Sequence, residues 1–334
     1  VVAVRADMDA LPVKEDTGFA FASTKTTELD GRTVSVAHAC GHDIHMSVAL
    51  GTATVLAKRR DELAGPVLFI FQPAEEGAPP GEEGGAPLML KEGLFDKYEP
   101  TAVFGLHTMP SIETGRIGHT SGPSMASADR FRIVIDGKQS HGANPHQGID
   151  PVVMASQAVL ALQTIPSRSL NPLEPSVLTV GIINGGERFN IIPASVELWG
   201  TVRAFSEDVQ DTIEQRMHEV LKGVTEPAGG GYTLEYERIN PFLNNDPALS
   251  ARARDSLVRA IGEDNVVDEG PLMIAEDFAW FAREIPGYYF RLGVRDPGAG
   301  SGGLHTPTFR ADDDSIVVGM RAMTRLVLDY LASN

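Results

Sequence analysis

Towards both ends of the chain lie short apolar runs, and between the first two of them is a segment whose apolar side chains recur at helical spacing. The runs at 1–4, 67–71, 103–106 and 288–294 are almost wholly apolar, which is typical of strands buried on both faces. Residues 44–63 instead carry apolar side chains three or four positions apart, and Gly65-Pro66 follows them as a stop signal. This alternation predicts an α/β layer built on a mostly parallel sheet.

The middle of the chain follows a different pattern. Phe131, Ile133 and Ile135 alternate with polar neighbours, which predicts a strand at 130–137 with one solvated face. A helix is expected at 149–165, strands at 176–183 and 195–205, a helix at 207–223 and a strand at 232–238. The order β-α-β-β-α-β is that of a ferredoxin-like α+β sandwich. We therefore expect an α/β domain formed by 1–118 and 238–334, with a second domain inserted at 119–237.

Composition and charge restrict the kinds of partner. Apolar residues make up 42% of the 334 positions and charged residues 22%, as in ordinary soluble globular proteins. No stretch reaches the roughly 18 unbroken apolar residues of a membrane span. The net charge of −17 is typical of a well-solvated surface and disfavours nucleic acid, whose phosphates require basic contacts. Neither a nucleic acid nor a membrane is expected as a partner.

Cysteine usage bears on the cellular compartment. A single cysteine excludes an internal disulfide and is typical of a reducing compartment, so a cytoplasmic location is expected.

Residues that are able to bind a metal follow the predicted strands. Asp7 and Asp9 follow the first strand, Glu75 and Glu76 follow the second, and His107 is expected to end the third. Because ligands bind at the carboxyl ends of the strands in open α/β sheets, these side chains are expected to converge. Further candidates are His38, Cys40, His42 and His45 before the first long helix, and His305 in a glycine-rich turn. Imidazole, thiolate and carboxylate together suit Zn²⁺, Mn²⁺, Co²⁺ or Ni²⁺ better than Mg²⁺ or Ca²⁺.

Each of these residues also has a purely structural explanation. A lone cysteine is most often a small buried apolar residue, a histidine after a buried strand is often a hydrogen-bonded core residue, and aspartates often form turns. A nucleophilic cysteine at Cys40 is another alternative, but it would leave the clustered carboxylates and histidines unexplained. The chain has no Gly-x-Ser-x-Gly turn, no phosphate-binding loop and no His-Glu-x-x-His helix. The whole set favours a metal-dependent hydrolase.

The motifs, taken in their order along the chain, resemble those of the M20 metallopeptidase family. The resemblance is to its amidohydrolase branch of N-acyl-amino-acid, hippurate and auxin-conjugate hydrolases in particular. The resemblance rests on the segments 5–12, 37–43, 72–76, 105–107, 140–146, 190–193, 276–278 and 304–307. It implies a catalytic domain with two metal ions and an inserted lid domain that usually pairs with a second subunit, hence a homodimer or higher homo-oligomer. The segment that precedes the first strand in the family is absent, and the chain opens at Val1 without Met, so roughly 50 or more residues are expected to be missing.

The resemblance assigns roles to residues of the α/β domain. The ligands of two divalent ions (Zn, Mn, Co or Ni) would be Cys40, His42, Glu76, His107 and His305, and Glu75 would be the general base. Cys40 stands where the wider family has a bridging aspartate. Asp7 replaces a metal-binding histidine of the wider family, so its contact with metal stays open, and Asp9 would orient a ligand. His38, Asp43 and His45 would shape the turn.

The resemblance also assigns roles to the inserted domain and predicts a reaction. His141 would polarise the scissile carbonyl, often across a dimer interface, and Asn190 and Arg203 would hold the substrate. Structural roles remain the alternative, a loop-stabilising histidine for His141 and an ion pair for Arg203. The predicted reaction is the metal-dependent hydrolysis of N-acyl-L-amino acids to a carboxylic acid and a free amino acid. The alternatives are a dipeptidase or aminoacylase of another branch, and a non-catalytic metal-binding relative.

Overall fold

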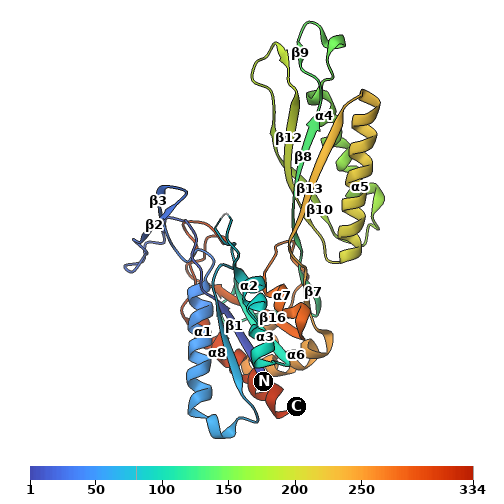
Figure 1. Cartoon of the computed structure of the whole chain (residues 1–334). Coiled ribbons are helices and arrows are strands. Elements are labelled where there is room, and N and C mark those ends of the chain that lie inside the picture. Colours follow the sequence, from blue (N-terminus) through green and yellow to red (C-terminus); the bar gives the residue numbers. More distant parts are fainter. Residues whose placement is uncertain (80, 334) are drawn as a thin grey trace. The chain divides into compact units, whose positions relative to one another are not determined.

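The computed structural model describes residues 1–79 and 81–333, which form two compact units (Figure 1). The main unit comprises Val1–Ser124, Asn244–Pro271 and the chain from Asp277 onwards. The inserted unit comprises Met125–Leu243 and the short segment Leu272–Glu276. That segment belongs to the inserted unit because the backbone N–H of Ala126 donates to the carbonyls of Leu272 and Ile274.

The main unit is built on a six-stranded sheet in the order β15-β6-β16-β5-β1-β4. The strands are β1 (Val2–Asp7), β4 (Val67–Gln72), β5 (Ala102–Glu113), β6 (Ile117–His119), β15 (Val266–Asp268) and β16 (Gly287–Arg295). All neighbours pair in parallel except β16 and β6, which are antiparallel. The predicted α/β class with a mostly parallel sheet is therefore confirmed.

Helices cover both faces of this sheet. They are α1 (His42–Lys58), α2 (Gly85–Lys91), α3 (Leu94–Tyr98), α6 (Pro247–Ile261), α7 (Phe278–Glu284) and α8 (Asp314–Ala332). One core cluster joins α1, α6 and α8 to alternate strand positions such as Val4, Phe104 and Phe290. The intervening Tyr289 points the other way and contacts Phe278 of α7, with ring centroids 4.8 Å apart. Period-two alternation within each strand thus supplies two apolar faces.

Two boundaries in the main unit differ from prediction. The first long helix ends at Lys58 and is followed by a short 3-10 turn, five residues before the predicted end. The third strand does not end at His107 but continues to Glu113, because residues beyond Phe104 leave β1 and keep pairing with β16. His107 therefore lies within a strand, past the end of its pairing with β1.

The inserted unit is an antiparallel four-stranded sheet in the order β10-β12-β8-β13 with two helices. Its elements are β8 (Ala128–Asp136), α4 (Pro151–Leu162), β10 (Val177–Asn184), β12 (Ser195–Arg203), α5 (Glu207–Thr225) and β13 (Gly231–Asn240). Phe131, Ile133 and Ile135 are fully buried against the helices, as their alternation predicted. The order β-α-β-β-α-β matches the predicted ferredoxin-like sandwich.

Smaller elements complete the fold. They are the strands β2 (Thr26–Leu29), β3 (Arg32–Ser35), β7 (Gly122–Met125), β9 (Ser140–His141), β11 (Ile191–Ile192) and β14 (Leu243–Asn245), the 3-10 turns Arg60–Glu62, Pro145–Gln147, Glu226–Ala228 and Glu263–Asn265, and the π-turn Ile165–Ser169. Among the described residues, no helix combines the length and the apolar character that crossing a membrane requires.

Candidate metal centre

A tight turn carries Cys40 into helix α1. Gly41 has φ +80, and a Cβ at this position would lie 2.4 Å from Oγ1 of Thr108. That hydroxyl donates a 2.8 Å hydrogen bond to the carbonyl of Cys40. Glycine is therefore required here both for the left-handed backbone and for the close approach of Thr108. The turn brings Cys40 and His42 beside strand β5, which carries His107.

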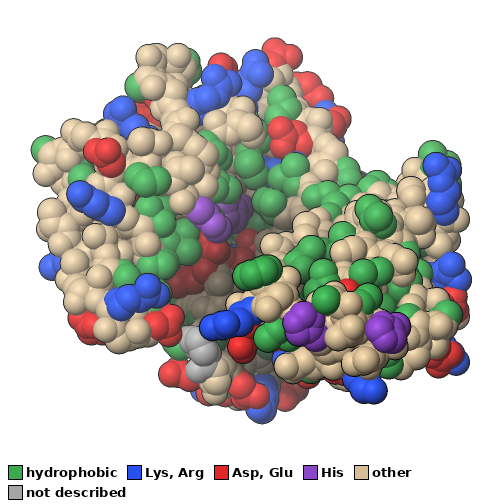
Figure 2. Space-filling model, turned by 90° about the horizontal axis from the view of Figure 1, so that it is seen from above, with side chains coloured by type: hydrophobic (Ala, Val, Ile, Leu, Met, Phe, Trp, Pro, Cys, Tyr) green, Lys and Arg blue, Asp and Glu red, His purple; other side chains and the backbone are tan. Residues whose placement is uncertain are grey.

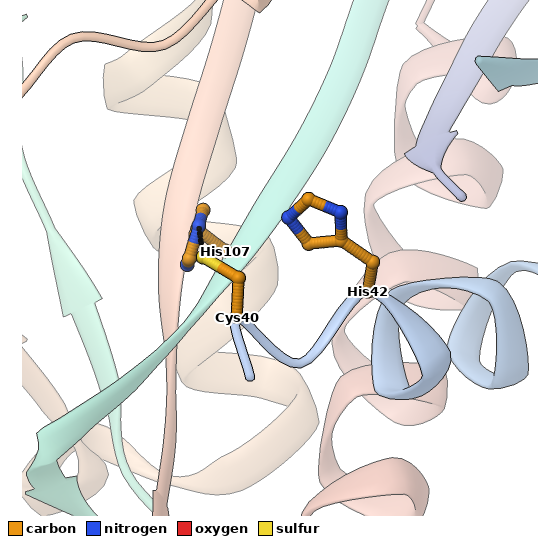
Figure 3. Close-up of side chains that lie close together, drawn as sticks. All are labelled: Cys40, His42 and His107. Atoms are coloured by element: carbon orange, nitrogen blue, oxygen red, sulfur yellow. Dashed lines mark hydrogen bonds between the residues drawn. The ribbon is translucent and has the colours of Figure 1, made fainter. Parts of the chain in front are cut away.

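Cys40, His42 and His107 form the first group of candidate ligands (Figure 3). Their ligand atoms all lie within 4.8 Å of one another, and all three residues are buried. Sγ of Cys40 is 3.4 Å from Nε2 of His107. Figure 3 shows that the sulfur and one imidazole come from the turn and the start of α1, and the other imidazole from the strand.

Cys40 also belongs to a second group, with Glu76 and His305. Nε2 of His305 lies 3.2 Å from Sγ of Cys40 and 2.9 Å from the Glu76 carboxylate. His305 has φ +62, and its backbone N–H donates to the carbonyl of Ala39 at 2.8 Å. Because the thiol is shared by both groups, Cys40 is placed where one sulfur could bridge two ions.

Hydrogen bonds orient the imidazoles toward the centre of this cluster. Nδ1 of His107 lies 2.7 Å from the carbonyl of Thr108, which can only accept, so Nδ1 carries the proton and Nε2 is left with its lone pair. Nδ1 of His42 lies 3.1 Å from Asp9, which also accepts the backbone N–H of Glu76 at 2.9 Å. One carboxylate therefore contacts two residues of the candidate ligand set.

The donor set fits a divalent cation. Nε2 of His42 is buried and has no hydrogen-bond partner among the described residues. It lies 3.8 Å from an oxygen of Asp7 and 3.9 Å from one of Glu75. A buried nitrogen with anionic neighbours and no partner is costly unless a cation compensates it. Nitrogen, sulfur and oxygen donors together suit borderline transition metals.

Carboxylates dominate the electrostatics of the cluster. Burial and the carboxylates of Glu76, Glu75 and Asp7 raise the pKa of the Cys40 thiol. Burial alone would lower the pKa of His42, but the hydrogen bond to Asp9 and the charge of Asp7 raise it to about 9. Burial lowers the pKa of His107 to about 4. A bound cation would displace the protons of the thiol and of His42.

Asp7 belongs to a buried network beneath the candidate ligands. Its two oxygens accept hydrogen bonds from Arg5 at 2.7 Å and from Nδ1 of His45 at 2.5 Å. Nε2 of His45 in turn accepts the backbone N–H of Thr108 at 2.9 Å, next to His107. These contacts favour a supporting role for Asp7 over direct contact with metal. His45 lies in the network, whereas His38 and Asp43 line a separate cavity.

Three further residues of this network have no role among the sequence-based predictions. Arg5 donates to Gln72 and to Asp277, each at 2.8 Å, and Gln72 donates to Asp277. Asp277 also accepts the backbone N–H of Ala86. The sequence feature that could have revealed this network is Arg5, a charged residue at the end of the apolar first strand. An arginine in a buried strand must be paired.

The candidate residues of the inserted unit lie at two opposite ends of its sheet. His141 pairs with Ile191 through the β9–β11 ladder, and the carbonyl of Asn190 accepts the N–H of Gly142, so these two residues lie together. Strand β12 begins at Ser195, shortly after β11, and ends eight residues later at Arg203. At about 3.3 Å per residue the two ends are roughly 26 Å apart. Arg203 donates to the carbonyl of Ser127, and burial lowers its pKa despite the charge of Asp129.

Comparison with known proteins gives matches over most or nearly all of the chain. The profile of Peptidase family M20/M25/M40 matches residues 3–329. N-acetyl-L-cysteine deacetylase of Bacillus subtilis is 39% identical over 316 residues, which cover 95% of this chain and 71% of that protein. N-acyl-L-amino acid amidohydrolase of Geobacillus stearothermophilus is 43% identical over 247 residues, covering 74% of this chain and 63% of that protein.

The fold is also similar to that of a solved structure. The YXEP protein of Bacillus subtilis, a dinuclear metal-binding peptidase from the M20 family, superposes with a TM-score of 0.84 at 33% identity. The match covers 100% of this chain and 82% of that one.

Proposed function

The chain belongs to Peptidase family M20/M25/M40 and is thus a hydrolytic enzyme that acts on amides, and we propose that it cleaves N-acyl-L-amino acids to a carboxylic acid and a free amino acid. The observation that carries the proposal is the shared position of Cys40 between two ligand groups, together with the carboxylate of Glu75 that lies 3.9 Å from Nε2 of His42. Relatives named for N-acetyl-L-cysteine and for N-acyl-L-amino acids support this substrate class.

Two divalent ions, of Zn, Mn, Co or Ni, are the proposed cofactors. His42 and His107 would hold one, Glu76 and His305 the other, and Cys40 would bind both. When bound, such ions polarise an amide oxygen and lower the pKa of water. A dinuclear peptidase of the same fold supports the number of ions.

Glu75 is the proposed general base. Its side chain is nearly buried, and one oxygen lies 3.9 Å from the unpartnered nitrogen of His42. From this position it would accept a proton from water and return it to the amine that leaves. The water oxygen joins the acyl carbon as the carbon–nitrogen bond breaks, so one water is consumed for each amide.

The inserted unit would contribute His141 as the group that stabilises the developing oxyanion, with Asn190 and Arg203 holding the substrate. Since about 26 Å of strand separates Arg203 from the end with His141, one copy of this unit cannot bring all three to one substrate. We propose a homodimer in which these residues come from different subunits. The open edge strand β10, with exposed Ile182 and Ile183, supports an interface on this unit.

The test is turnover of a substrate panel by the metal-loaded protein. Benzoyl-, acetyl- and indoleacetyl-amino acids are expected to be hydrolysed faster than dipeptides. Faster turnover of dipeptides would instead favour another branch of the family. No turnover of any substrate with two ions bound would indicate a non-catalytic relative.

Glu75→Gln is expected to lower kcat by about 10²-fold or more while metal content stays unchanged, because it removes the proton acceptor. Glu92→Gln, at an exposed position of the same unit, is the matched control and should turn over normally. Near-normal turnover by Glu75→Gln with both ions bound would overturn the assignment.

A further inference from the structure

A cavity of about 350 Å³ borders the turn that carries Cys40. It is lined by Ala39 and Thr306, the neighbours of two candidate ligands, but not by the side chain of any of the five candidate ligands. Its volume lies within the range of small-molecule sites in proteins. Figure 2 shows histidine and acidic side chains close together on one face of the molecule. The lining of this cavity is mixed, with aromatic, basic and acidic side chains.

An aromatic platform forms one wall of the cavity. The rings of Phe19 and Phe21 are stacked with their centroids 4.9 Å apart, and Phe21 is 73% exposed. Val36, Ile44 and Phe309 extend the apolar lining. A large aromatic side chain this exposed beside a cavity offers a flat surface on which a ring can stack.

Two cations line the cavity and form no ion pair among the described residues. The guanidinium of Arg310 lies 4.4 Å from the centroid of Phe19, and Lys25 stands nearby in the lining. Among the described residues, no carboxylate lies within ion-pair distance of either one. The carboxylate of Glu15 is instead occupied by Thr17 and by the backbone of Ser23.

The lining also contains two aspartates and a histidine. Asp43 lies in the first turn of α1, and Asp313 occupies the N-cap position of α8 without a side-chain capping hydrogen bond, so the dipole of each helix favours its negative charge. Nδ1 of His38 is buried without a hydrogen-bond partner among the described residues. The cavity therefore offers two cations and an exposed aromatic ring.

We propose that this cavity is a non-catalytic binding site for a small carboxylic acid with an aromatic body. The carboxylate would pair with Arg310 and Lys25, and the ring would stack on the exposed Phe21, because Phe21 and Arg310 already cover Phe19. The site would communicate with the metal centre, because the carbonyl of Ala39 accepts the N–H of His305. The acid released in the proposed reaction belongs to this class, and a feedback role for the site rests on that proposed function.

The test titrates benzoate into the metal-loaded enzyme and follows the heat of binding. Two binding events are expected, one at the metal centre and one at the cavity. Arg310→Gln should weaken one event by about tenfold or more and leave the other unchanged, because it removes a charge-assisted pair. Arg321→Gln, an exposed arginine of α8, is the matched control and should bind as the wild type does.

Further arms separate this site from catalysis. Phe21→Leu keeps an apolar side chain and should weaken the same event as Arg310→Gln. Acetate should fail to occupy the cavity because it lacks the ring. Glu75→Gln should retain both events, so loss of hydrolysis leaves this proposal intact. Identical benzoate binding by the wild type and Arg310→Gln would overturn the site, as would a single event that disappears when the metal is removed.

Discussion

Cys40 is the residue on which the proposed metal chemistry depends most. Its sulfur lies 3.4 Å from His107 and 3.2 Å from His305, two residues of different ligand groups. Cys40→Ser replaces a soft donor with a weak one, so binding is expected to fall below two ions and kcat by about 10²-fold or more. Cobalt titration provides the measurement, since a bound thiolate gives a charge-transfer band that the variant should lack.

Cys40→Asp is the matched variant for this prediction. A carboxylate can bridge two ions, so this change should restore binding of two ions without restoring the charge-transfer band. Retention of the band in Cys40→Ser would show that the sulfur is not a ligand.

His42 makes the affinity for metal depend on pH. The hydrogen bond to Asp9 and the charge of Asp7 outweigh burial and raise the pKa of His42 to about 9. Below that pH a cation must displace the proton, and the buried thiol of Cys40 loses one as well. Apparent affinity is therefore expected to fall by about tenfold or more for each pH unit between 8 and 6.

Calorimetry in buffers of different ionisation enthalpy counts the released protons directly. Asp9→Asn should lower the pKa of His42 and make the dependence shallower, because it removes the charge that stabilises the imidazolium. An affinity that does not change between pH 6 and 8 would contradict this account.

The turn before α1 determines where the ligands point. Gly41→Ala introduces a left-handed alanine whose Cβ lies 2.4 Å from Thr108 Oγ1, the group that donates to Cys40. We expect a loss of about 2–4 kcal/mol in the free energy of unfolding, measured in urea, together with weaker metal binding. Gly31→Ala is the control for backbone strain alone, because it also has positive φ but nothing within 4 Å.

Gly31→Ala should cost about 1 kcal/mol and leave metal binding unchanged. An equal loss of stability in both variants would mean that the contact with Thr108 does not matter.

The distance between His141 and Arg203, which lie at opposite ends of the inserted sheet, leads to a prediction for the proposed dimer. If each site takes His141 from one subunit and Arg203 from the other, a heterodimer of His141→Ala and Arg203→Ala subunits contains one intact site. Differently tagged subunits can be co-expressed and purified together. The heterodimer should then recover about half of the wild-type turnover, whereas each homodimer stays inactive. An inactive heterodimer would place both residues in the site of one subunit.

Local patterns in the chain were sufficient for the fold class, whereas the choice of five ligands among the candidate residues rested on the resemblance to a known family. Apolar runs separated by helical spacing, and the alternation at Phe131, Ile133 and Ile135, report burial directly, because strand and helix periods are properties of neighbouring residues. The residue types around Cys40 limited the chemistry to metals that accept sulfur and nitrogen. The ends of elements were less predictable, as the continuation of β5 past His107 shows, since they depend on partners far along the chain.

Contacts between distant segments could not be read from those patterns. Arg5 is 272 positions from Asp277, and Cys40 is 265 positions from His305. A pattern within one segment does not show which distant polar group will contact a residue of that segment in the folded chain. Chain folding therefore assigned Arg5 to its network, brought the thiol of Cys40 between two ligand groups, and separated Arg203 from His141 by the length of a strand. Each of these outcomes depends on sheet order and register, which involve the whole chain.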